Sequence, residues 1–167
     1  AISAGYCSRS GNARGQIEGN KTKMNMAYKI NLPLNRDWEI ETEITTTEDG
    51  DAVSCFYANG LDPKKTPGTI EIYAGDINGS DPRTECLNNY DAALGLEDGE
   101  DPVHELPFCG QTAWYYDCED DHQHPVIVIC VEINPGVLAI VILGERNEEK
   151  LDELMSYVDE NLSISAE

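Results

Sequence analysis

The densest set of potential metal ligands is the run Cys118-Glu119-Asp120-Asp121-His122-Gln123-His124. In an extended segment His122 and His124 point to the same side, and Asp120 could complete a zinc or copper site with nitrogen and oxygen ligands. One hypothesis is therefore a metal-binding protein or metal-dependent enzyme centred on Asp120, His122 and His124. The alternative is a solvated loop before a strand, with Cys118 held in a disulfide.

A second candidate site is the aromatic run Trp114-Tyr115-Tyr116. If this run is a strand, Trp114 and Tyr116 lie on one face and Tyr115 on the other. Aromatic rings with polar rims can stack on sugars, so Trp114 and Tyr116 are candidate binding residues. The alternative is that one face of this strand simply belongs to the core.

Motifs for catalysis or for a resident cofactor are absent where we would expect them. The sequence contains no G-x-S-x-G, no H-E-x-x-H, no G-x-G-x-x-G and no phosphate loop with a following Lys. Segment 76–81 begins like a calcium loop, but Asp81 and Leu87 stand where that loop needs Gly and Glu. We therefore predict no catalytic residue, and a divalent metal is the one cofactor that we retain.

Six cysteines form an even set without any C-x-x-C pair: Cys7, Cys55, Cys86, Cys109, Cys118 and Cys130. This favours disulfides over a zinc finger, with buried thiols as the alternative. We predict a Cys109–Cys118 bond, because Gly110 and Gln111 could turn the chain back and a short loop closes easily. Cys7 is expected to bond to Cys86 or Cys55. Disulfides indicate an extracytoplasmic location, either secreted or attached to the cell surface.

Charge is distributed very unevenly along the 167 residues, whose formal net charge is −21. Residues 1–36 carry a net charge of +5, and residues 37–167 carry −26. Such an acidic body repels phosphate backbones, which argues against nucleic-acid binding and favours cations or a basic protein as partners. No apolar run is long enough to span a membrane. We predict a basic polar arm over 1–23, anchored by a disulfide, and one domain over 24–167.

Alternating or continuous apolar patterns predict strands at 26–32, 38–45, 52–58, 69–74 and 113–118. The runs 126–133 and 137–143 are apolar on both faces and flank Asn134-Pro135-Gly136, so we predict a hairpin at the centre of a covered sheet. Asp81 and Pro82 begin a helix with an apolar stripe from Cys86 to Leu94. Asn147 caps a second helix, whose stripe is Leu151, Leu154, Met155, Val158 and Leu162.

These elements predict an α+β fold, with a mainly antiparallel sheet covered by two helices. The segment Tyr28-Lys29-Ile30-Asn31-Leu32-Pro33 followed by Trp38, together with the hairpin and C-terminal helix, resembles PsbP-like α/β/α sandwiches. That family includes the photosystem oxygen-evolving subunit and many bacterial lipoproteins. The resemblance implies a noncatalytic binding or assembly role. Our leading hypothesis is accordingly an exported, noncatalytic binding or interaction module with an acidic surface.

Overall fold

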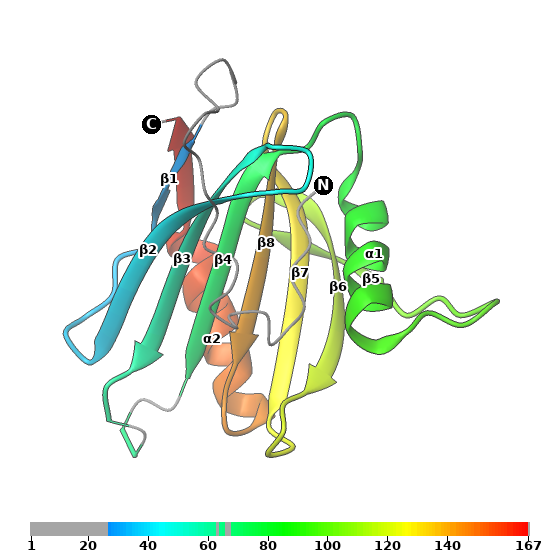
Figure 1. Ribbon diagram of the computed structural model, residues 1–167. Coiled ribbons are helices and arrows are strands. Elements are labelled where there is room, and N and C mark those ends of the chain that lie inside the picture. Colours follow the sequence, from blue (N-terminus) through cyan, green and yellow to red (C-terminus); the bar gives the residue numbers. More distant parts are fainter. Residues whose placement is uncertain (1–26, 63, 66–67, 167) are drawn as a thin grey trace.

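The computed structural model describes residues 27–62, 64–65 and 68–166, and within them two antiparallel sheets and two helices (Figure 1). The large sheet has seven strands in the order β2-β3-β4-β8-β7-β6-β5. Its strands are β2 (Trp38–Thr46), β3 (Ala52–Gly60), β4 (Thr69–Asp76), β5 (His104–Phe108), β6 (Gln111–Glu119), β7 (Pro125–Asn134) and β8 (Val137–Gly144). This architecture confirms the predicted α+β class. The predicted arm at 1–23 and its anchor Cys7 lie outside the described residues.

The hairpin of β7 and β8 forms the middle of the large sheet, as its doubly apolar pattern predicts. Every residue of β8 is buried. Alternate residues face opposite sides: Ile127 and Ile129 belong to one core cluster, and Val128 and Cys130 to the other. The sheet is therefore covered on both faces, and each face has its own core.

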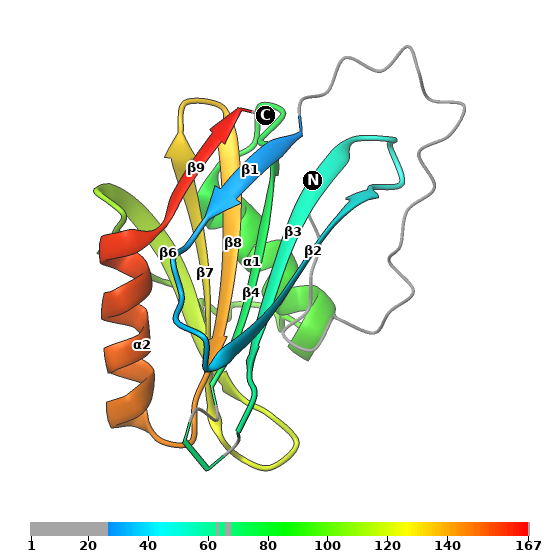
Figure 2. The ribbon, with the colours of Figure 1, turned by 90° about the vertical axis from the view of Figure 1, so that its left-hand side faces the viewer.

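Helix α2 (Glu148–Asn161) covers one of these faces, which we call the α2 face (Figure 2). Asn147 caps it by accepting a hydrogen bond from the backbone of Lys150, and Leu151, Leu154 and Val158 are buried against the sheet. The small sheet of β1 (Tyr28–Asn31) and β9 (Ser163–Ala166) lies beside α2 on the same face. Buried Tyr28 and Ile164 join this core.

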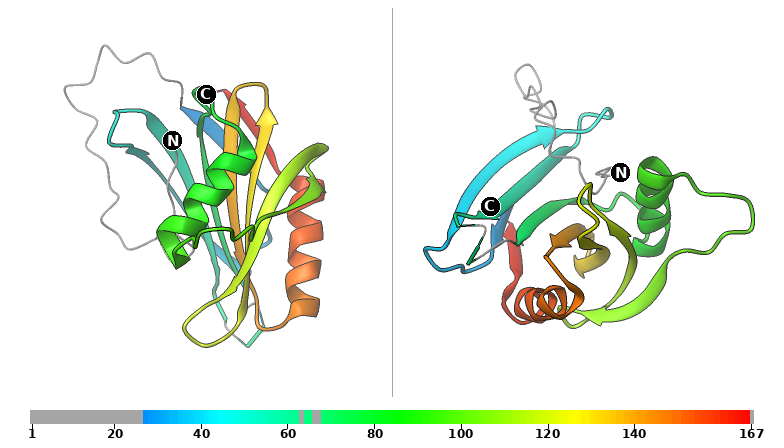
Figure 3. Two further views of the ribbon diagram at one scale, coloured as in Figure 1. Left: turned by 90° about the vertical axis from the view of Figure 1, so that its right-hand side faces the viewer. Right: turned by 90° about the horizontal axis from the view of Figure 1, so that it is seen from below.

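Helix α1 (Pro82–Leu94) crosses β6 and β7 on the opposite face, the α1 face (Figure 3). Asp81 caps the helix, Pro82 is its first residue, and Gly95 ends it with φ at 80°. These ends agree with the sequence prediction, and so does the first part of the predicted apolar stripe, because Cys86 is buried and Leu87 and Tyr90 pack against the same core. The stripe does not extend to Leu94, which is 45% exposed, and the polar residues Glu85 and Asn89 are buried beside Cys86.

The sequence analysis did not predict β5 or β9, and it assigned no partner strand to β1. β5 contains Pro107 and lies at the edge of the large sheet, and β9 is a four-residue strand. β1 pairs with β9, which is more than 130 residues away, so no local pattern indicates its partner. None of the described helices is long and apolar enough to cross a membrane.

Candidate functional site

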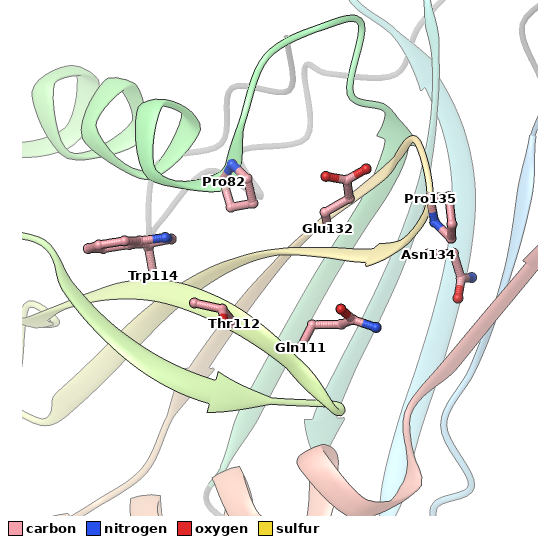
Figure 4. Close-up of a pocket in the computed structure, with 7 residues that line it drawn as sticks. All are labelled: Pro82, Gln111, Thr112, Trp114, Glu132, Asn134 and Pro135. Atoms are coloured by element: carbon pink, nitrogen blue, oxygen red, sulfur yellow. The ribbon is translucent and has the colours of Figure 1, made fainter.

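A groove of about 480 Å³ lies on the α1 face, where the N-terminus of α1 meets the ends of β6 and β7 (Figure 4). We call it the Trp114 groove. Its lining combines one aromatic ring with amide, hydroxyl and carboxylate groups: Pro82, Gln111, Thr112, Trp114, Glu132, Asn134 and Pro135. Such a lining can hold a ligand through both ring contact and hydrogen bonds.

The antiparallel register of β6 and β7 brings the groove residues together. Trp114 lies opposite Cys130, and the alternation of side chains places Trp114 and Glu132 on the α1 face. The β7–β8 turn supplies Asn134 and Pro135 at one end, and Pro82 overhangs the groove from the first turn of α1. Residues from three elements, distant in sequence, therefore build a single site.

Trp114 already carries a cation on its ring. The guanidinium carbon of Arg83 lies 5.5 Å from the centroid of the indole ring. The same guanidinium donates a hydrogen bond of 3.0 Å to the carboxylate of Asp101. The guanidinium of Arg83 thus makes a cation–π contact with the indole ring while it pairs with a carboxylate. The ring of Trp114 is therefore able to bind a cation.

Among the residues that the structure describes, Glu132 is the only titratable one that lines the groove. Its Oε2 accepts a hydrogen bond of 2.8 Å from the backbone N–H of Gly136, which fixes the carboxylate beside the turn. Gly136 has φ at 80°, a conformation that favours glycine. Asn134 is held as well, because its side-chain amide donates to the carbonyl of Ile164 on β9.

Only one of the two predicted aromatic binding residues reaches the groove. Trp114 lines it, whereas Tyr116 is 1% exposed. The hydroxyl of Tyr116 donates a hydrogen bond of 2.6 Å to Asn89, and its ring packs edge-on against Tyr90 at 5.1 Å between centroids. Tyr116 thus attaches α1 to the sheet and offers no surface to a ligand.

The predicted metal ligands lie together on the loop between β6 and β7. Nδ1 of His124 lies 3.5 Å from Oδ2 of Asp120, and the rings of His122 and His124 are 6.1 Å apart. Oδ1 of Asp120 accepts the backbone N–H groups of both histidines, at 2.8 and 2.9 Å. Within the described part of the chain, no three His, Cys, Asp or Glu residues are grouped as a metal site requires. The metal centre stays a hypothesis.

The hydrogen bonds of Asp120 also change its acidity. Burial raises its pKa, but the backbone N–H groups of His124 and His122 outweigh burial, so the pKa of Asp120 lies below its usual value. Asp120 consequently keeps its charge and holds the turn in shape.

The predicted Cys109–Cys118 disulfide is not present. Cys109 stands in the turn before β6 and Cys118 near the far end of this nine-residue strand, and the two sulfur atoms are not bonded. An extended strand rises about 3.3 Å per residue, so the two residues are roughly 25 Å apart. The prediction relied on a turn at Gly110 and Gln111, but the strand that follows this turn carries Cys118 away from Cys109.

The segment 76–81 leads into a helix instead of forming a calcium loop. Asp81 caps α1, the hydroxyl of Ser80 donates to Glu85, and Asp76 accepts from the hydroxyl of Tyr28. The oxygen atoms therefore turn toward separate partners in the protein.

Comparison with known proteins yields little. No protein-family model matches the sequence, and no curated protein matches it significantly. Among solved structures, the chain is similar to LpqN of Mycobacterium tuberculosis, described as involved in cell envelope biogenesis. The TM-score is 0.44 and the identity 17%, over 84% of this chain and 85% of that chain. Nothing in these comparisons names a PsbP-like protein, so that resemblance stays a prediction.

The fold and site nevertheless define a class. The protein is an α+β domain with an antiparallel sheet covered on both faces, and a groove lined by polar and apolar groups lies beside the helix on one face.

Proposed function

We propose that this protein is an exported, noncatalytic binding module, and that its Trp114 groove receives a basic side chain of a protein partner. The observation that carries this proposal is the pairing, within one groove, of an indole ring and the fixed carboxylate of Glu132. A lysine or arginine can contact both, because the ring attracts a cation through its π face and the carboxylate through its charge. The contact of Arg83 with Trp114 is an example of this chemistry within the chain.

The charge of the whole molecule supports a basic partner. A net charge of −21 attracts positively charged proteins over several ångströms and speeds their association at low salt. Long-range attraction of this kind brings a partner to the surface but does not select a site. Selection requires a groove with its own shape and with acceptors for a donating side chain, and the Trp114 groove supplies both.

We infer binding without catalysis from the composition of the groove. Its lining provides one carboxylate, one hydroxyl and two side-chain amides, besides the indole and two prolines. Covalent catalysis needs a nucleophile in contact with a base. The carboxylate of Glu132 instead accepts a hydrogen bond from the backbone of Gly136.

Calorimetric titration of a hexa-arginine peptide tests the proposal. In about 150 mM salt, where surface charges are well screened, we expect Glu132→Gln to weaken binding at least about fivefold. A matched control is Glu119→Gln, which removes the same charge from the exposed end of β6. The control should change the affinity less than about twofold.

Equal losses in the two variants would show that binding depends only on total charge, and would overturn the proposal. Binding of a neutral oligosaccharide that Glu132→Gln leaves unchanged would also overturn it, in favour of ring stacking on a sugar. Circular dichroism should confirm that both variants retain the fold, since the glutamine amide oxygen can still accept from Gly136.

A further inference from the structure

Cys86 and Cys130 meet in the core of the α1 face. Cys86 lies on α1 and Cys130 on β7, and neither has any exposed surface. The two thiols share a hydrogen bond, and both are free in the structure. Helix α1 packs directly on β7, so two cysteines that are 44 positions apart in sequence belong to one buried cluster.

The face of α1 that touches the sheet is unusually polar for a covering helix. Its fully buried residues are Glu85, Cys86 and Asn89, with Leu87 and Tyr90 partly buried beside them, whereas α2 buries Leu151, Leu154 and Val158. Burial of leucine and valine is what normally attaches a helix to a sheet, at about 1.5–3 kcal/mol for each side chain. Helix α1 therefore has fewer fully buried apolar side chains than α2.

Glu85 is a buried acidic residue on this face of α1. Its side chain is 2% exposed, and although Oε2 accepts from Ser80 at 2.6 Å, Oε1 has no hydrogen-bond partner among the described residues. A buried oxygen without a partner opposes the docking of the helix. Another attachment must offset it.

We propose that Cys86 and Cys130 form a disulfide that fastens α1 to the sheet. A small-molecule disulfide such as oxidised glutathione is the oxidant. One cysteine thiolate attacks it and releases one glutathione thiol, and the second cysteine thiolate then displaces the other. Two electrons pass from the cysteines to the glutathione disulfide, and the two cysteine protons end on the two glutathione thiols.

We expect the disulfide to form while the chain folds, because both thiols are fully buried once α1 has packed on the sheet. Exchange needs a thiolate and access for the reagent. In the folded protein, the hydrogen bond with Cys86 and complete burial raise the pKa of Cys130 well above its usual value, and Glu85 adds to the effect. Once folded in the reduced form, the pair should react slowly.

Peptide mapping tests the proposal directly. Cleavage after glutamate places Cys86 in peptide 86–97, Cys130 in peptide 120–132, and Cys109 with Cys118 in peptide 106–119. The reduced, unfolded full chain is refolded in a glutathione redox buffer, alkylated and digested without reductant. We expect peptides 86–97 and 120–132 to be joined, with a mass two hydrogens below their sum. Alkylated Cys86 and Cys130, or bonds from either one to another cysteine, would overturn the proposal.

Thermal unfolding gives a second readout. For the refolded protein, reductant should lower the Tm by about 10 °C, the scale expected when a long closed loop is opened in a chain of this size. The double variant Cys86→Ala, Cys130→Ala should lack most of this response, and Cys55→Ala should retain it. Cys55 is a suitable control because it is equally buried, at 2% exposed, but lies on β3 away from α1. A response of equal size in the double variant and in Cys55→Ala would contradict the proposal.

Discussion

Asp81 is the residue on which the start of α1 depends. Its Oδ1 accepts the backbone N–H of Thr84 and its Oδ2 accepts the hydroxyl of Thr84, both at 2.9 Å. The backbone bond and then the hydroxyl bond lower the pKa of Asp81 from its usual value. Both bonds favour the charged carboxylate, so the cap is strongest when Asp81 is ionised.

Removal of this cap should cost stability in a pH-dependent way. We expect Asp81→Ala to lower the free energy of unfolding by about 1 kcal/mol at pH 7. Because the folded pKa is depressed, the contribution of charge is complete above the unfolded pKa and is lost as the pH falls through the folded pKa. Urea unfolding at pH 7 and near pH 3 measures it. Asp98→Ala, in an exposed loop, is the control, and a difference that persists unchanged at low pH would contradict the expectation.

Asp120 allows the metal hypothesis to be separated from a purely structural role. If the carboxylate mainly holds the turn, Asp120→Ala should lower the free energy of unfolding by about 1 kcal/mol, since two backbone N–H groups lose their acceptor. Zinc should then raise the Tm of the native protein by less than about 1 °C. A saturable rise that His122→Ala abolishes would instead establish the metal site.

The two helices differ in how they are attached to the sheet, and substitutions should reveal the difference. Leu154 on α2 is 8% exposed, whereas Leu94 on α1 is 45% exposed. We expect Leu154→Ala to cost about 3 kcal/mol through lost burial and a cavity, and Leu94→Ala less than about 0.5 kcal/mol. Denaturant unfolding of the two variants checks this. Similar losses would mean that Leu94 packs in solution as the sequence pattern suggested.

Sequence predicts those elements whose pattern is local. The cap Asn147 and the apolar stripe identify α2, and the doubly apolar hairpin identifies the middle of the sheet. The buried face of α1 was predictable only in part, because the stripe includes Cys86 but does not indicate the contacts of Cys86 with Cys130 and of Asn89 with Tyr116. Those contacts are nonlocal. The pairing of β1 with β9 was hidden for the same reason.

The site was predictable only in part. The aromatic run pointed to Trp114, but Gln111, Glu132 and Pro82 join it through strand register and helix placement. No spacing in the sequence indicates this set. Cys109 and Cys118 show the converse error, since nearness in sequence suggested a bond that the length of β6 forbids.

The protein carries many more acidic than basic side chains, 32 against 11, so most carboxylates have no lysine or arginine to neutralise them. Residues 84–145 contain 13 acidic residues and no Lys or Arg. Among the described residues, Arg83 pairs with Asp101 and Lys150 with Glu153. Some carboxylates are stabilised by neutral donors instead, since the hydroxyls of Tyr57 and Tyr73 donate to Glu43 and Glu71. Repulsion among the remaining carboxylates should oppose folding.

Salt should relieve that repulsion in a way that distinguishes screening from a specific ion site. Screening by sodium chloride weakens repulsion between exposed charges gradually, so we expect the Tm to rise smoothly with salt concentration. A calcium site in the folded state would add about 2.7 kcal/mol at a hundred times its dissociation constant, or roughly 5–10 °C for a chain of this size. The 76–81 segment uses its oxygens for α1 and for Tyr28, so we expect millimolar calcium at constant ionic strength to add less than about 1 °C. Melting curves with calcium and with matched sodium chloride test this, and a saturable rise with calcium alone would establish an ion site that the loop geometry does not indicate.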